Sequence, residues 1–239
     1  MQSTTQRGNI LFLILLAVVL FAALSYAVTS STRGGGNNAS TESDKAAAAV
    51  MLQAASLIEN TFNRMLLTGG FPDYGIELNY YFPYRNPNCG STSCRLLDMA
   101  GGGLSTRILS LPTSYQNPAS PLGAGQTQFK FMMSAVNGVG TSAPDLVLYA
   151  EVLSPGICKA LNDMLGITAT SVYNQNTPGS AFSPHNSVTP VGAWPSTTSQ
   201  IGEEATATDL IGRRAACGCY QADCGNDYDT RFYYVVYAK

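Results

Sequence analysis

The feature that most constrains this chain is an uncharged, apolar run near its N-terminus. No charged residue lies between Gly8 and Thr32, and the run Ile10–Val28 is interrupted only by the polar residue Ser25. A helix rises about 1.5 Å per residue, so this run would reach roughly 28 Å, close to the thickness of the hydrocarbon core of a bilayer. It has no polar face, which excludes a short amphipathic helix. The sequence therefore predicts a transmembrane helix over residues 9–28.

The residues alone leave two interpretations of this segment open. As a permanent anchor, it ties the rest of the chain to a membrane by one span. As a secretory signal, it is removed after Ala27, because Ser25-Tyr26-Ala27 places small residues at the two positions that signal peptidase reads. Both interpretations put the remaining residues outside the cytoplasm.

The residues before the run support a third interpretation. A short polar leader ends in Arg7-Gly8 and is followed at once by Asn9 and the apolar residues 10–13. This arrangement resembles the class III leader of type IV pilins and minor pseudopilins. The resemblance implies that a prepilin peptidase cuts between Gly8 and Asn9, that the new N-terminus is methylated, and that the apolar helix packs in a filament core. The chain departs from the family at Leu13, where a glutamate is usual.

The segment after the run changes character twice. Residues 29–43 are polar and contain three consecutive glycines, each of which costs about 1 kcal/mol in a helix relative to alanine, so a flexible linker is expected. From Asp44 to about Leu67, apolar residues recur at helical spacing, and Gly69-Gly70 supplies a stop. An amphipathic helix is therefore expected to lie along a sheet.

Short strand-like runs follow the predicted helix. Strands are expected over 76–82, 128–133, 146–153 and 231–238. Ser154-Pro155 predicts the start of a short helix, and the polar residues 168–205 predict a long surface excursion. The expected fold is thus α+β: a transmembrane helix, a linker, and an amphipathic helix packed on an antiparallel sheet with disulfide-stapled loops, as in pilin-like domains. The expected segments are a leader (1–8), a membrane helix (9–28), a linker (29–43) and an extracytoplasmic domain (44–239).

Six cysteines lie in the C-terminal region: Cys89, Cys94, Cys158, Cys217, Cys219 and Cys224. An even number in an extracytoplasmic domain predicts up to three disulfides, for which fifteen pairings exist. Close spacing favours Cys89 with Cys94 and Cys219 with Cys224, which leaves Cys158 a distant partner such as Cys217. A zinc site is the rival, but the intervals do not match zinc motifs and no histidine lies nearby.

A calcium site is the one cofactor site that the sequence suggests. Carboxylate and amide oxygens cluster just before the last predicted strand, at Asp223, Asn226, Asp227 and Asp229. Calcium prefers such oxygens. Their spacing is not that of an EF-hand, however, so a turn rich in Asx residues competes with the calcium site and is favoured.

The composition excludes several functions. A net charge of −2 with only 12% charged residues excludes a polybasic nucleic-acid-binding surface. The single histidine, His185, lies in the polar excursion without a nucleophile motif, and Glu203-Glu204 point apart as sequence neighbours. An enzyme is not expected.

Two functions remain. The resemblance implies a structural subunit of a type IV pilus-like or type II secretion-like filament. Its partners would be the inner membrane as a single-pass protein, copies of itself or related subunits, and prepilin peptidase, and its C-terminal domain would lie in the periplasm or outside the cell. The alternative is a tethered module that recognises a surface, a sugar or a protein through residues 168–205 and the tyrosine-rich stretches 80–84 and 232–237.

Overall fold

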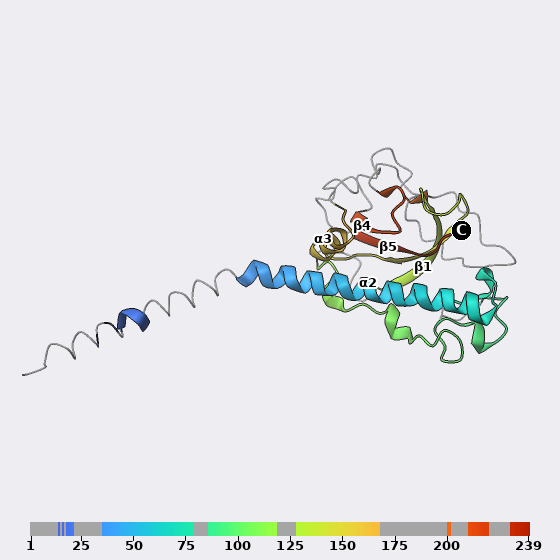
Figure 1. The fold of residues 1–239 in the computed structure, drawn as a ribbon, viewed down its shortest axis with the longest axis horizontal. Coiled ribbons are helices and arrows are strands. Elements are labelled where there is room, and N and C mark those ends of the chain that lie inside the picture. The colour runs from blue at the N-terminus through green and yellow to red at the C-terminus, as the bar shows by residue number, and fades with distance from the viewer. Residues whose placement is uncertain are drawn as a thin grey trace, which may run out of the picture. The chain divides into compact units, whose positions relative to one another are not determined.

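The computed structural model describes residues 14, 16, 18–21, 35–78, 86–118, 128–167, 200–201, 210–219 and 230–239. The chain divides into two compact units, Met1–Ser43 and Asp44–Lys239. The described residues form the helices α2 (Gly35–Gly69) and α3 (Pro155–Met164), together with strands (Figure 1). The strands are β1 (Phe129–Val136), β2 (Asp145–Ala150), β3 (Gln200–Ile201), β4 (Ala215–Cys219) and β5 (Thr230–Tyr237).

The strands form one sheet in the spatial order β3-β1-β2-β5-β4. β1, β2, β5 and β4 pair antiparallel, and the short β3 pairs parallel with the end of β1. In the central pairing, Leu148 lies opposite both Phe131 of β1 and Tyr234 of β5. β5 is the last strand in the sequence, yet it lies inside the sheet, between β2 and β4.

α2 supplies much of the core on one face of the sheet. Its buried residues recur at spacings of three and four and include Met51, Ala55, Ile58 and Phe62. They share a cluster with residues from several strands, such as Phe232 of β5. The helix begins at Gly35, earlier than the sequence predicts, and extends over glycines because adding a turn to a packed helix costs far less than starting one. It ends at Gly69, and Gly70 follows with a φ of 63°.

The sheet is buried on both faces. α2 and α3 cover one face, and a second cluster on the other joins strand residues such as Tyr149 and Tyr233 to Ile167, Ile201 and Leu210. Neighbouring residues of β5 point to opposite faces, yet Phe232 and Tyr233 both have an exposed fraction of 0%. Both faces of this strand therefore carry a packed layer.

The expected membrane span is corrected by the structure. In the part of the chain that is described, no helix is long and apolar enough to cross a membrane. This finding overturns both the transmembrane helix expected over 9–28 and the single-pass inner-membrane location. Of the run Ile10–Val28, only residues 14, 16 and 18–21 are described. The long helix α2 carries charged residues such as Asp44, Lys45 and Glu59, which are costly in hydrocarbon.

The other predicted elements agree with the structure only in part. α3 forms where it was predicted, with the Ser154 Oγ accepting a hydrogen bond from the Ile157 N–H at 3.3 Å. The strand expected over 76–82 is reduced, in its described part, to an isolated bridge between Glu77 and Arg95, and residues 79–85 lie outside the description. β4 was not predicted, because a short Ala-, Gly- and Cys-containing run has little strand propensity of its own.

Candidate functional site

Disulfides form where the sequence predicts them in the described residues. Cys89 bonds to Cys94 within one loop, and Cys158 of α3 bonds to Cys217 of β4. These four sulfur atoms are therefore not thiolates, so they cannot act as the zinc ligands that were considered. The side chain of Cys219 and the whole of Cys224 lie outside the described part.

Several other candidates also lie outside the described residues, so they remain predictions. They are Gly8 and Asn9 of the processing site; Asp223, Asn226, Asp227 and Asp229 of the calcium site; and His185, Glu203, Glu204 and the aromatic stretch 80–84. Within the described ranges, no three His, Cys, Asp or Glu side chains come together as a group that could hold a metal ion.

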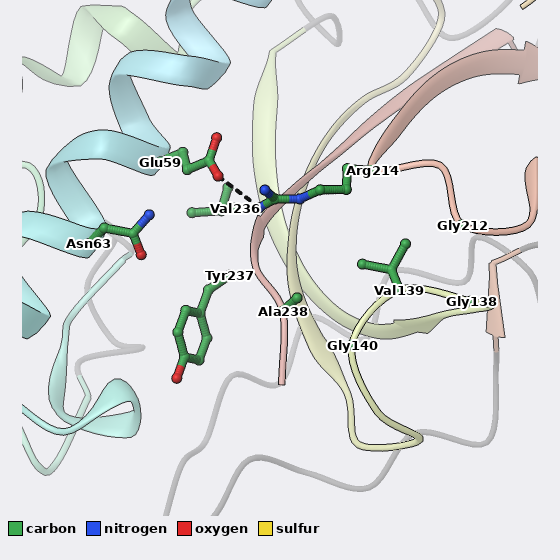
Figure 2. Close-up of a pocket in the computed structure, with 10 residues that line it drawn as sticks. All are labelled: Glu59, Asn63, Gly138, Val139, Gly140, Gly212, Arg214, Val236, Tyr237 and Ala238. Atoms are coloured by element: carbon green, nitrogen blue, oxygen red, sulfur yellow. Dashed lines mark hydrogen bonds and ion pairs between the residues drawn. The ribbon is translucent and has the colours of Figure 1, made fainter.

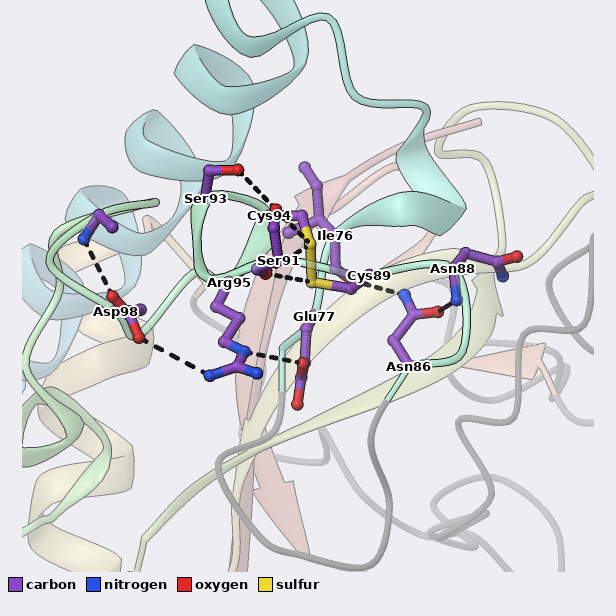
Figure 3. A network of polar contacts seen from close by, with 11 residues as sticks. Ile76, Glu77, Asn86, Asn88, Cys89, Ser91, Ser93, Cys94, Arg95 and Asp98 are labelled. Atoms are coloured by element: carbon purple, nitrogen blue, oxygen red, sulfur yellow. Dashed lines mark hydrogen bonds and ion pairs between the residues drawn. A yellow bond between two sulfur atoms is a disulfide. The ribbon is translucent and has the colours of Figure 1, made fainter.

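A polar network holds the Cys89–Cys94 loop against residues 76–77 (Figure 3). The Glu77 N–H donates to the Cys94 carbonyl at 2.9 Å, and the Asn86 side chain donates to the Ile76 carbonyl at 3.1 Å. The Arg95 Nε lies 3.3 Å from the Glu77 carboxylate, an ion pair whose geometry falls short of a hydrogen bond. These contacts join residues of the segment 76–95 to one another and hold the Cys89–Cys94 loop in place.

α3 is attached to β4 at two points. Besides the disulfide, the Asn162 Nδ2 donates to the Cys217 carbonyl at 2.8 Å, and the Asn162 Oδ1 accepts from the Cys217 N–H at 2.9 Å. One amide thus satisfies both backbone groups of a β4 residue that are directed away from β5. Exposed strand edges attract other chains, and this side chain closes the edge at Cys217.

Glu59 joins α2 to the sheet through both carboxylate oxygens. Its Oε1 accepts from the Arg214 Nη2 at 2.7 Å, and its Oε2 accepts from the Tyr234 hydroxyl at 2.5 Å. Arg214 also donates to the Val235 carbonyl at 3.1 Å. Burial, reinforced by the hydrogen bond and the negative charge of Glu59, raises the pKa of Tyr234 to about 12. The phenol therefore stays protonated and donates at neutral pH.

An open pocket of about 490 Å³ lies beside the contacts of Glu59 with Arg214 and Tyr234 (Figure 2). Its wall comes from α2, from the turn between β1 and β2, from the residues before β4 and from the end of β5. The lining residues are Glu59, Asn63, Gly138, Val139, Gly140, Gly212, Arg214, Val236, Tyr237 and Ala238.

Glycines bring two backbone segments of the wall together. Gly138 has a φ of 76°, and a Cβ added there would lie 2.7 Å from the Gly212 nitrogen. Only glycine combines this left-handed backbone with so close an approach. That part of the wall is consequently bare backbone.

No motif in the sequence singles out the residues of this pocket. One signal was present: Glu59 follows Ala55 by one helical turn, which places a carboxylate beside the buried stripe and calls for a partner. The partners Arg214 and Tyr234 lie 155 and 175 residues away along the chain, so no local pattern identifies them.

No known protein family, curated protein or solved structure matches this chain. Its function must therefore follow from its own residues and their arrangement.

Proposed function

We propose that this chain is a structural subunit of a type IV pilus-like or type II secretion-like filament. The observation that carries the proposal is the order of the segments along the chain. An uncharged apolar run, Ile10–Val28, follows Arg7-Gly8 and precedes a long helix, and the C-terminal part of that helix belongs to the core of an antiparallel α+β domain. The resemblance of the leader to that of pilins points to the same function.

The apolar run supplies the driving force for assembly in this proposal. Apolar surface removed from water contributes about 25 cal/mol per Å². Copies that pack their runs against one another would bury this surface, and the absence of any charge between Gly8 and Thr32 means that no ion must be desolvated.

The attachment of α2 to its domain suits a subunit that bears load. A filament subunit whose assembling segment precedes α2 transmits tension through this helix. The buried face of α2, the bonds from Glu59 to Arg214 and Tyr234, and the bond from Arg64 to the Gly102 carbonyl at 2.6 Å all resist its detachment. The two disulfides add covalent cross-links within the same domain.

The alternative of a tyrosine-lined recognition surface has less support. Tyr149 and Tyr233 are buried, and the Tyr234 hydroxyl is engaged by Glu59. Tyr233 and Tyr234 therefore serve the core and the contacts of Glu59, which leaves Tyr237 as the tyrosine of the stretch 232–237 that lines the pocket.

Processing of the native protein tests the proposal. The expected result is an intact mass and an N-terminal sequence that begin at Asn9, and filaments visible by negative-stain electron microscopy. Gly8→Val should abolish both, because the peptidase requires a small residue before the cut.

Gly90→Val is the matched control, since Gly90 is exposed and an added Cβ meets nothing within 4 Å. It should leave processing and assembly intact. Native protein that begins at Met1 or Val28, or a Gly8→Val variant that is processed like the wild type, would refute the proposal.

A further inference from the structure

The pocket beside Glu59 presents hydrogen-bonding groups of every type. Glu59 accepts hydrogen bonds and Arg214 donates them, whereas the Asn63 amide can do both. Figure 2 shows Glu59 and Asn63 on α2 and Arg214 and Tyr237 on the sheet side, with the Tyr237 hydroxyl directed away from the other three side chains. A complementary ligand therefore needs several groups that each donate and accept.

The charges in the pocket disfavour ionic ligands. The Glu59 and Arg214 side chains lie 2.7 Å apart and neutralise each other, with exposed fractions of 15% and 53%. An anion near Arg214 also meets the Glu59 carboxylate, and a cation near Glu59 meets the guanidinium. A zwitterion would have to separate the pair, which Tyr234 and the Val235 carbonyl also hold in place. A neutral ligand leaves the pair intact.

A purely apolar ligand is disfavoured for a different reason. It would cover the Asn63 amide and part of the guanidinium without offering hydrogen bonds, and polar groups that lose water without a new partner weaken binding. The ligand class that remains is neutral and rich in hydroxyl groups, because a hydroxyl both donates and accepts.

The shape and the aromatic wall narrow this class further. A volume of about 490 Å³ lies within the range of small-molecule sites and is open on one side. The Tyr237 ring is supported by Phe62, with ring centroids 5.6 Å apart and planes inclined at 51°. A pyranose carries hydroxyls around its rim and an apolar C–H face, which can pack on an aromatic ring.

We propose that this pocket is a binding site for a neutral saccharide of one or two pyranose rings. Asn63 and Arg214 hydrogen-bond the hydroxyls, the Tyr237 ring supports the apolar face of the sugar, and the Glu59–Arg214 pair remains closed. The proposal does not depend on filament assembly, since every residue that carries it lies in the unit Asp44–Lys239.

Saturation-transfer NMR on the full-length, disulfide-intact chain tests the proposal. The probes are methyl β-D-glucopyranoside, methyl β-D-galactopyranoside and N-acetyl-D-glucosamine, each at up to about 50 mM, well above the roughly millimolar dissociation constant expected of a small open site. At least one probe should show saturation transfer that titrates to a plateau.

Two asparagines on α2 provide a matched pair of variants. Asn63→Ala removes one pocket amide and should raise the dissociation constant roughly threefold to tenfold, the value of one hydrogen bond. Asn60→Ala removes an amide on the exposed face, where Asn60 contacts Ser56, and should leave it unchanged. Alanine favours helix at both positions, so both variants should fold.

Three results would overturn the proposal. The first is no saturation of any of the three sugars. The second is a sugar whose affinity responds equally to Asn60→Ala and Asn63→Ala, which would place binding elsewhere. The third is saturation of the zwitterion L-alanine in the absence of any sugar signal, which would assign the pocket to ionic ligands.

Discussion

Asn162→Ala should be among the more destabilising single substitutions in α3. The wild-type amide makes two hydrogen bonds to the backbone of Cys217, a residue with an exposed fraction of 0%. Alanine makes neither bond, and the disulfide from Cys158 keeps α3 over β4, so water has little room to replace the amide. The Cys217 N–H and carbonyl are then left without partners.

The size of the effect follows from these two groups. A hydrogen bond contributes about 1 kcal/mol net, and a buried group left unsatisfied costs about 1–3 kcal/mol. Two groups thus cost about 2–6 kcal/mol, and the better helix propensity of alanine returns about 0.5 kcal/mol. The free energy of unfolding should fall by about 1.5–5.5 kcal/mol.

Urea unfolding of the oxidised full-length protein measures this difference. The matched control is Asp163→Ala at the next position, which removes only the exposed ion pair with Lys159 and should cost about 0.5 kcal/mol or less. Hydrogen exchange gives a second readout, since the Cys217 amide should lose protection in Asn162→Ala alone. Equal destabilisation by the two variants, or unchanged protection of Cys217, would refute the reasoning.

Two further predictions concern the disulfides and a buried carboxylate. Replacing Cys158 and Cys217 with alanine should cost about 4 kcal/mol and replacing Cys89 and Cys94 about 2 kcal/mol, because the sequence separations are 59 and 5 residues and closing a longer loop restricts the unfolded chain more; thermal unfolding that ranked the two variants in reverse would contradict this. Burial raises the pKa of Asp145 above 3.8, against hydrogen bonds from Lys239 and Val136 that lower it, so its contribution to stability is greatest below that value and is lost as pH rises through the folded-state pKa. The wild type should therefore lose stability relative to Asp145→Asn as the pH rises above about 4 in urea unfolding, and a difference that does not change with pH would disprove the assignment.

Local sequence patterns predicted the two helices α2 and α3. The apolar spacing from Asp44 to Leu67 predicted most of α2, and the Ser154-Pro155 pair predicted the start of α3. The membrane span predicted from hydropathy over residues 9–28 is not among the helices that the structure describes. β4 was missed because a short strand depends on its neighbour β5 and on Asn162 for its conformation.

The sequence by itself determined the α+β character of the chain, the periodicity of its long helix and the presence of disulfides, because these depend on residue type and short-range spacing. The tertiary structure alone decided the strand order and the contacts of Glu59 with Arg214 and Tyr234. These contacts join residues up to 175 positions apart. Their energies depend on the burial and geometry of both partners, and neither partner has a local signature that specifies the other.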